Sequence, residues 1–161
     1  MISSQMAQAQ GAVLATRTAY PIDASSIRRW AIAVYWPETP PERFLCGRPL
    51  LAPEEFNPFA WAVAAAEESP NGNIELNDPD RLEKLLGLPP LGLTVQLNGG
   101  VEMRYLAPMQ EGDVITSVNR LARYAEREGR RGPMLLSTTE DTWTNQEGRK
   151  VLTSTMTLIR Y

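Results

Sequence analysis

One stretch of the sequence, residues 50–66, most constrains the fold because it combines a helix-start signal with a nearly unbroken apolar run. Pro53 can occupy a first helical position without losing a needed hydrogen bond, and Glu54 and Glu55 suit the positive end of a helix dipole. The side chains that follow are apolar on every face of a helix, which indicates a buried helix. Pro58 would kink this helix or move its start downstream. We therefore predict a buried central helix in this stretch.

The composition is that of an ordinary globular chain and excludes several functions. Of the 161 residues, 43% are hydrophobic and 22% are charged, and the formal net charge of −3 argues against nucleic-acid binding. No apolar run approaches the roughly 18 residues that a membrane span needs. No basic segment precedes an apolar one at the N-terminus, so a secretory signal is not expected. We therefore expect a single cytoplasmic domain over residues 1–161, with residues 1–11 flexible.

The chain contains no histidine and one cysteine, Cys46, and both facts restrict its chemistry. Without histidine, the Ser-His-Asp and Cys-His arrangements and the usual zinc sites are excluded, and we expect no metal site. Proton transfer would have to use Asp, Glu, Tyr, Lys or a water molecule. A lone cysteine excludes an internal disulfide and fits a reducing compartment, and we expect Cys46 to be a buried structural thiol.

Local patterns predict a strand, a helix and a surface excursion around the central stretch. Residues 13–18 fit a short strand. Asp23, Ser25 or Ser26 can cap a helix that ends before Pro37. Its apolar residues recur at the spacing of one helical face, at Ile27, Trp30, Ala31 and Val34.

The segment after the central stretch, residues 67–93, has the composition of a surface excursion. Residues 71–73, Asn-Gly-Asn, fit a turn. Asp78 or Asp80 can cap a short helix over residues 81–87, whose final glycine suits a helix end.

The last third of the sequence changes to the two-residue period of β-strands. Alternating or β-branched segments occupy residues 99–106, 114–124, 134–143 and 151–161, with turn residues between them. This spacing predicts a four-stranded antiparallel meander. Two helices followed by such a meander indicate the α+β class. A buried helix wrapped by an antiparallel sheet is the hot-dog arrangement, which is one of several α+β folds that this pattern fits.

Four segments carry a resemblance to a known family. They are IRRWAIAVYWPETPP at residues 27–41, LLAPEEFNPFAW at 50–61, LNGGVEMRYLAPMQEGDVI at 97–115 and GPMLLSTTEDTWTNQEGRKVLTSTMTLIRY at 132–161. The most specific motifs in them are Arg104-Tyr105-x-x-Pro108-x-x-x-Gly112-Asp113 and the turn Asn145-Gln146-x-Gly148. On these segments the chain resembles the MaoC-like hydratase/dehydratase group, particularly its FAS1-like dehydratase half-domain.

The resemblance implies a hot-dog fold, in which an antiparallel sheet wraps around a long central helix and two units join into one continuous sheet. It implies a substrate carried as an acyl thioester on coenzyme A or an acyl carrier, and no permanently bound cofactor. The family's usual reaction is the reversible addition of water across a 2,3-enoyl thioester. The partner implied is a second copy in a homodimer or a catalytic MaoC-like subunit in a heteromer.

The resemblance also implies that the usual catalytic pair is missing. Catalytic members of the family carry an Asp and a His in a motif that resembles G-D-x-N-P-x-H. The matching stretch here is residues 35–41, where Trp36 stands near the Asp position and Pro40 or Pro41 near the His position. Neither Trp nor Pro can exchange a proton in this role.

Three functions therefore remain open. The chain could be a subunit that shapes the acyl tunnel of a heteromeric hydratase while its partner supplies the chemistry. It could be a self-sufficient enzyme in which Glu38, Glu54 or Glu55 transfers protons and Asn57 or Asn98 polarises a carbonyl, although Glu54 and Glu55 also fit helix-start charges. It could instead be a non-catalytic binding module for an apolar or polycyclic ligand.

Aromatic side chains are concentrated where the resemblance implies an acyl tunnel. They are Trp30, Tyr35, Trp36, Phe44, Phe56, Phe59 and Trp61. We predict substrate contacts from Tyr35, Trp36, Phe56, Asn57 and Phe59. Ordinary core packing is the alternative for most of the aromatic residues, because they bury a large area wherever they lie.

Two further signals have both a functional and a structural explanation. Asn98, Gly99 and Gly100 could let backbone amides approach a thioester oxygen, or they could form a turn that needs positive φ. Five arginines could attract coenzyme A phosphates or simply form a solvated hairpin tip. They are Arg120, Arg123, Arg127, Arg130 and Arg131.

Overall fold

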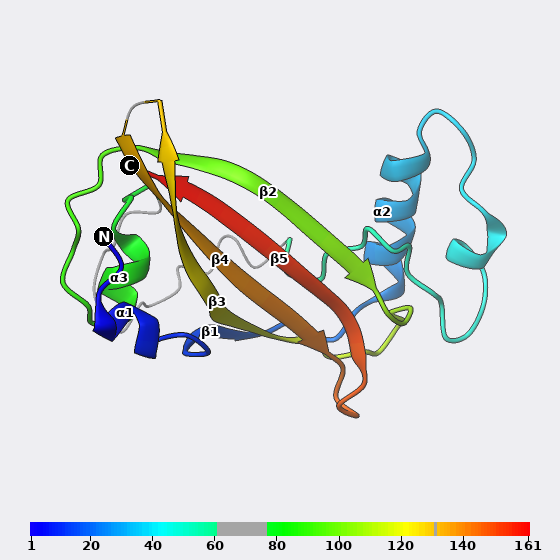
Figure 1. Ribbon diagram of the computed structural model, residues 1–161. Coiled ribbons are helices and arrows are strands. Elements are labelled where there is room, and N and C mark those ends of the chain that lie inside the picture. Colours follow the sequence, from blue (N-terminus) through cyan, green and yellow to red (C-terminus); the bar gives the residue numbers. More distant parts are fainter. Residues whose placement is uncertain (61–76, 131) are drawn as a thin grey trace.

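The computed structural model describes residues 1–60, 77–130 and 132–161, which contain a five-stranded antiparallel sheet and a few short helices (Figure 1). The strands are β1 (Val13–Thr18), β2 (Gln96–Tyr105), β3 (Thr116–Gly129), β4 (Gly132–Thr144) and β5 (Lys150–Arg160). The helices are α1 (Ser4–Gln8), α2 (Ala24–Tyr35), the 3-10 helix η1 (Glu42–Phe44) and α3 (Arg81–Leu85). Within the described part of the chain, no helix is long and apolar enough to cross a membrane.

The strands lie in the order β1-β3-β4-β5-β2. The predicted meander is confirmed for β3, β4 and β5, but it is wrong for β2, which pairs with β5 instead of β3. The connection from β2 to β3, over residues 106–115, is too long for a tight hairpin. Its middle pairs with Leu51 through an isolated bridge at Gln110. Because β2 is last in the strand order, it lies at an edge of the sheet.

The predicted strand at residues 13–18 and the predicted helix after Asp23 are both confirmed. The Asp23 side chain caps α2 by accepting a hydrogen bond from the Ser26 amide at 2.9 Å. Hydrogen bonds from the Ser26 hydroxyl and amide hold the pKa of Asp23 below its usual value. An ionised oxygen at a helix N-terminus satisfies a backbone N–H that has no partner within the helix.

Residues 4–8, within the segment expected to be flexible, form α1. The Ser3 side chain accepts a hydrogen bond from the Met6 amide at 3.2 Å and so caps this helix. Met6 is only 2% exposed and packs with Leu121 and Leu135 of the sheet. One apolar side chain therefore anchors this short polar segment to the sheet.

The prediction of a central helix is wrong for residues 53–60, which form successive turns. The rest of the predicted helix, residues 61–66, lies outside the described residues. The Phe56 amide donates to the Pro53 carbonyl at 3.0 Å, and the Ala60 amide donates to the Asn57 carbonyl at 3.2 Å. The Asn57 side chain accepts a hydrogen bond from the Phe59 amide at 2.9 Å, which is the local turn that asparagine favours. Pro58 has no N–H to donate within a helix, so turns replace helical hydrogen bonds.

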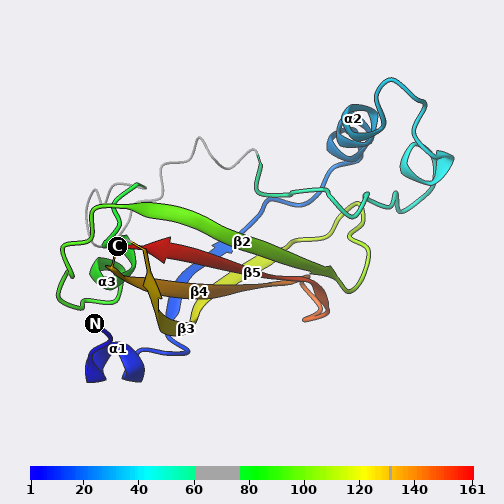
Figure 2. The same ribbon diagram turned by 45° about the horizontal axis from the view of Figure 1, so that its top comes forward.

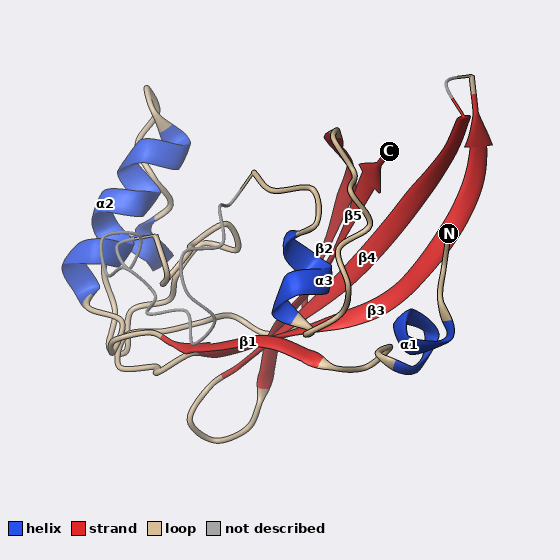
Figure 3. Ribbon diagram, turned by 90° about the vertical axis from the view of Figure 1, so that its left-hand side faces the viewer, coloured by secondary structure: helices blue, strands red, loops and turns tan. Residues whose placement is uncertain are grey.

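Apolar side chains form two clusters at opposite ends of the sheet. The first packs α2, residues 50–59 and the ends of the long strands around Ile27, Leu50 and Ile115. The second packs α1 and α3 against Leu121, Tyr124 and Leu135. Figures 1 and 2 show α2 at one end of the sheet and α1 and α3 at the other. Figure 3, viewed from the second end, shows α3 in front of the sheet.

The prediction that residues 67–93 form a surface excursion is wrong at α3, which has buried side chains. The turn predicted at residues 71–73 lies outside the described residues. The short helix itself is confirmed, with Asp80 at the N-cap position. The Asp80 side chain does not cap the helix but accepts a hydrogen bond from the Gly92 amide at 2.8 Å. Glu83 is fully buried, because α3 packs onto the sheet.

Glu83 forms a buried, bidentate ion pair with Arg160 of β5. The two guanidinium nitrogens of Arg160 donate to the Glu83 carboxylate at 2.6 and 2.8 Å. The Tyr124 hydroxyl donates to the same carboxylate at 2.9 Å, and Arg160 also donates to the Ser137 hydroxyl. Burial and the neighbouring Glu83 charge raise the pKa of Tyr124, so this hydroxyl stays protonated. The network fastens α3 to three strands.

The expectation of a buried thiol is wrong, because Cys46 is free and exposed. It follows η1, and in this segment Phe44 takes the buried position, with 6% of its side chain exposed. One large aromatic side chain anchors the loop, and the thiol beside it points to solvent.

The buried ion pair yields a stability prediction. Glu83→Ala should lower the free energy of unfolding by about 3–5 kcal/mol, because it leaves the Arg160 guanidinium buried without its partner. Urea unfolding followed by circular dichroism measures this loss. Glu128→Ala, a matched change at an exposed position of β3, should change the free energy by less than about 0.5 kcal/mol. Equal effects of the two substitutions would contradict a structural role for the pair.

Candidate functional site

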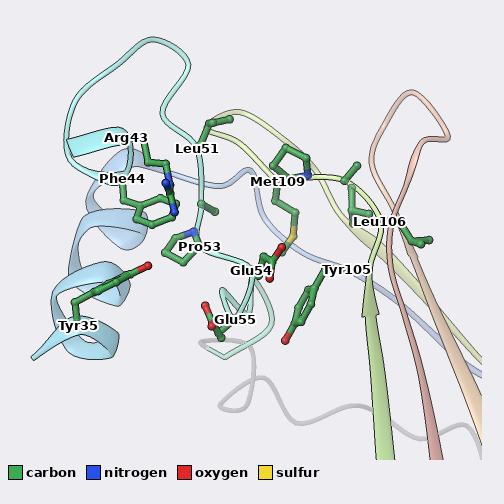
Figure 4. Close-up of a pocket in the computed structure, with 14 residues that line it drawn as sticks. Tyr35, Arg43, Phe44, Leu51, Pro53, Glu54, Glu55, Tyr105, Leu106 and Met109 are labelled. Atoms are coloured by element: carbon green, nitrogen blue, oxygen red, sulfur yellow. The ribbon is translucent and has the colours of Figure 1, made fainter. Parts of the chain in front are cut away.

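A cavity of about 390 Å³ lies at the α2 end of the sheet, beyond the end of β2 (Figure 4). Three walls form it: the end of α2 with η1, the segment at residues 51–55, and the chain at residues 105–109 after β2. Its lining residues are Tyr35, Arg43, Phe44, Leu51, Ala52, Pro53, Glu54, Glu55, Tyr105, Leu106, Ala107, Pro108, Met109 and Val151.

Backbone pairing holds two of these walls together. The Ala52 amide donates to the Met109 carbonyl at 2.9 Å, and the Glu111 amide donates to the Leu50 carbonyl at 2.8 Å. Leu50 is fully buried in the first apolar cluster, which anchors the pair of segments to the core. Residues 51–55 therefore lie alongside residues 105–109, the chain that follows β2.

The Gly-Asp turn of the sequence motif has a structural role beside this wall. The Asp113 carboxylate accepts hydrogen bonds from the Gln110 amide at 3.0 Å and from the Gln146 side chain at 3.4 Å. Gln146 in turn accepts a hydrogen bond from the Val114 amide at 2.8 Å. Gly112 supplies the positive φ of 88° that the turn requires. The two motifs quoted above therefore meet in space and fix the course of residues 106–113.

The wall from α2 and η1 is aromatic. The rings of Tyr35 and Phe44 lie 5.9 Å apart between centroids, and the Arg43 guanidinium lies 4.6 Å above the Phe44 ring. Arg28 of α2 donates to the Leu45 carbonyl at 3.0 Å, which ties η1 back to the helix. This contact keeps Arg43 and Phe44 at the cavity.

The cavity combines an apolar lining with a small number of polar groups. Leu106, Met109 and Val151 contribute apolar surface, and two tyrosines, Tyr35 and Tyr105, contribute hydroxyls. Glu54 and Glu55 add carboxylates, and Figure 4 shows them on the segment between α2 and β2. Such a site can enclose an apolar group, donate hydrogen bonds to a carbonyl and exchange protons through a carboxylate.

Three of the predicted site residues, Tyr35, Glu54 and Glu55, lie together at this cavity. Phe56 and Phe59 lie in the first apolar cluster instead, where Phe56 packs edge-on to Trp30 and Phe59 packs edge-on to Trp143. Asn57 is half-buried, and its side chain stabilises the local turn. Trp61 lies outside the described residues.

Glu38 and Trp36 lie outside the cavity lining, in the loop after α2. Both side chains are exposed, and Trp36 exposes 77% of its surface. This loop is the segment that the resemblance, and nothing further, matches to the family's catalytic motif.

Asn98, Gly99 and Gly100 lie within β2 at a bulge, so the predicted turn is wrong, although Gly100 does have the predicted positive φ, at 137°. Asn98 accepts a hydrogen bond from the Gly100 amide at 2.9 Å. A Cβ atom on Gly99 would approach the Ile159 side chain to 2.9 Å, so close packing requires this glycine. Gly99 precedes Tyr105 by six residues, or about 20 Å along a strand, so the cavity does not include the three residues.

The arginines of the predicted cluster lie on β3 and the hairpin after it, and Arg131 lies outside the described residues. Arg123, Arg127 and Arg130 are exposed, and exposed Arg120 donates to the Gly11 carbonyl at 3.2 Å. None of the four described arginines lines the cavity at the α2 end.

Sequence reasoning missed Arg43, Tyr105 and Met109 as cavity residues. Tyr105 is the last alternating residue of β2 and part of the quoted motif, so its position at a strand end was a usable signal. Arg43 had no comparable signal, since only η1 brings it to the cavity. Among the described residues, no group of three or more Cys, Asp or Glu side chains is placed to hold a metal ion.

Solved structures with a similar fold cover nearly the whole chain. The ChsH1-ChsH2 complex from Mycobacterium tuberculosis matches with TM-score 0.62 and 14% identity, over 98% of this chain and 89% of the other. The HadBC complex of the same organism, a 3R-hydroxyacyl-ACP dehydratase, matches with TM-score 0.54 and 12% identity, over 93% of this chain and 96% of the other. The MaoC-like dehydratase from Rhodospirillum rubrum matches with TM-score 0.52 and 18% identity, over 95% of this chain and 92% of the other.

The likeness confirms the predicted hot-dog fold, whereas the long central helix is not found in the described residues. No curated protein matches the chain. The family model described as "FAS1-like, dehydratase domain region" matches residues 8–154, which is most of the sequence. The chain therefore belongs to the family of FAS1-like dehydratase domains.

Proposed function

We propose that this chain is the acyl-thioester-binding subunit of an enoyl-thioester hydratase or dehydratase, and that a catalytic partner subunit supplies the Asp/His pair. The observation that carries the proposal is a dehydratase-family chain without histidine, whose loop at residues 35–41 has Trp36 and prolines where the family motif has its acid and base. Family membership supports the substrate class, and the missing pair supports the need for a partner.

The cavity at the α2 end is the proposed binding site for the acyl thioester. Its volume falls within the roughly 300–1,000 Å³ of small-molecule sites, and its lining is largely apolar. The Tyr35 and Tyr105 hydroxyls are the proposed donors to the thioester carbonyl. The thioester is carried on coenzyme A or an acyl carrier, and no permanently bound cofactor is involved.

Two comparisons support a heteromer. The ChsH1-ChsH2 and HadBC structures are both complexes of two different proteins. A chain with the fold of these complexes and no acid–base pair of its own fits the place of the non-catalytic member. The free, exposed thiol of Cys46 supports a reducing compartment, and we propose the cytoplasm.

A second candidate is a self-sufficient hydratase that uses Glu54 or Glu55, and their presence at the cavity favours it over catalysis by Glu38. One carboxylate would take a proton from water as the water oxygen bonds to C3 of the enoyl group. The electron pair of the C2–C3 double bond would then form an enolate, and C2 would receive a proton. A non-catalytic ligand-binding module is the third candidate, for which ligand would stabilise the fold without turnover.

Partner dependence is tested by hydration of crotonyl-coenzyme A and longer enoyl-coenzyme A. The purified chain alone should show no turnover above the buffer rate, because it lacks the acid–base pair. Addition of a MaoC-like subunit that carries the Asp/His motif should produce turnover that exceeds that of the added subunit alone. Full activity of the isolated chain would contradict this proposal and favour the second candidate.

Carboxylate substitution tests the second candidate directly. If Glu54 or Glu55 transfers the proton, Glu54→Gln or Glu55→Gln should lower kcat by about 10²–10⁴-fold in the isolated chain, since amides cannot exchange the proton. Glu38→Gln is the matched control, because Glu38 lies outside the cavity lining. Unchanged turnover in all three variants would remove these carboxylates from the mechanism.

A further inference from the structure

Among the described residues, Arg43 is the only cationic side chain that lines the cavity at the α2 end. It lies in the middle of η1, where the Leu45 and Cys46 amides both donate to the Glu42 carbonyl, at 2.9 and 2.8 Å. The buried Phe44 ring fixes this turn to the fold. The turn therefore holds Arg43 at the cavity, and its side chain is exposed, so a ligand can reach it.

Stacking leaves the hydrogen-bond donors of Arg43 free, because it uses only the flat face of the guanidinium. The guanidinium carbon lies 4.6 Å from the centre of the Phe44 ring, and the N–H donors point outward in the guanidinium plane. In the described part of the chain, no carbonyl or carboxylate accepts a hydrogen bond from them. By contrast, Arg28 donates to a backbone carbonyl and Arg160 to a carboxylate. The cavity therefore contains an oriented set of donors that a ligand can use.

Opposite charges in the cavity are kept apart. Glu54 and Glu55 line the same cavity, yet among the described side chains neither forms an ion pair with Arg43. Figure 4 shows Arg43 on the wall from η1 and Tyr105 on the opposite wall. Repulsion by the two carboxylates disfavours an anionic group near them, whereas the guanidinium attracts one. A negatively charged group of a ligand would therefore bind at Arg43.

A carboxylate is the anionic group that these donors fit best. The planar guanidinium can donate two parallel hydrogen bonds to the two oxygens of a carboxylate. Because Phe44 already orients the guanidinium, little rotamer freedom is lost when a carboxylate binds. Leu106, Met109 and Val151 provide apolar surface that suits a hydrocarbon chain attached to that carboxylate.

We infer that Arg43 determines specificity for acyl groups that carry a second carboxylate at the end away from the thioester. The Tyr105 hydroxyl would donate to the thioester carbonyl at one wall, and Arg43 would bind the carboxylate at the other. The inference rests on the proposed function, because it requires the acyl thioester to bind in this cavity. It adds the chemical class of the acyl group, which the proposed function leaves open.

The phosphates of coenzyme A are the other anions that this guanidinium could bind. They are common to every coenzyme A thioester, whatever its acyl group. Loss of a phosphate contact would therefore weaken the binding of all coenzyme A thioesters by the same factor. Loss of a contact to an acyl carboxylate would weaken only the ligands that carry the carboxylate. The ratio of two affinities therefore distinguishes the two sources of negative charge.

Isothermal titration calorimetry with glutaryl-coenzyme A and pentanoyl-coenzyme A measures this ratio. The two acyl chains have equal length and differ in a terminal carboxylate against a methyl group. The unmodified chain should bind the glutaryl thioester more tightly by about tenfold or more, because hydrogen bonds between charged groups are stronger than neutral ones. Arg43→Met should remove this preference and leave the affinity for the pentanoyl thioester unchanged. Arg43→Lys should keep only part of the preference, since an ammonium lacks the planar fork.

Arg48→Met is the matched control, because it removes the same charge from the loop after η1 but outside the cavity lining. It should keep the full preference, and thermal unfolding by circular dichroism establishes that each variant is folded. Equal affinity of the unmodified chain for the two thioesters would overturn the inference and leave thioester binding intact. So would a preference that survives Arg43→Met, including an equal loss of both affinities. Binding of neither thioester would overturn the proposed function, and the inference with it.

Discussion

Hydrogen bonding between β2 and β5 is the constraint on which the arrangement of the candidate site depends. It sets Met103 beside Ser154 and Tyr105 beside Leu152, so the end of β2 meets the first apolar cluster. The chain after β2 then runs along residues 50–52, and the cavity forms between them. The same pairing leaves the other side of β2 open. One ladder therefore explains both the cavity and the exposed edge.

The opposite end of the sheet is held by charge rather than by apolar contact alone. Arg160 and Glu83 are both fully buried, and burial of two charges is unfavourable unless good geometry and further hydrogen bonds compensate for lost water. The bidentate contact, the Tyr124 hydroxyl and the Pro79 carbonyl provide these bonds. These contacts tie α3 to β3, β4 and β5 at this end of the sheet.

The site residues illustrate how far local patterns reach. Tyr35 was predicted as an aromatic residue near the acyl tunnel that the resemblance implies, and Glu54 and Glu55 as nearby carboxylates; all three line the cavity. Phe56 and Phe59 have equally suitable types, yet they pack in the core, since an aromatic side chain at a turn can point either way. Arg43 and Met109 could not be predicted, because each reaches the cavity only through segments distant in the sequence.

The sequence by itself determined the strands, the capped helix after Asp23 and the absence of histidine chemistry. These depend on side-chain alternation, a local capping hydrogen bond and composition, none of which needs a distant contact. Only the tertiary structure decided that β2 joins β5 and that Glu83 is buried. Each of these is settled by competition between local propensity and contacts across the fold. The residues that make such contacts are far apart in the sequence, so local patterns cannot predict which of the contacts form.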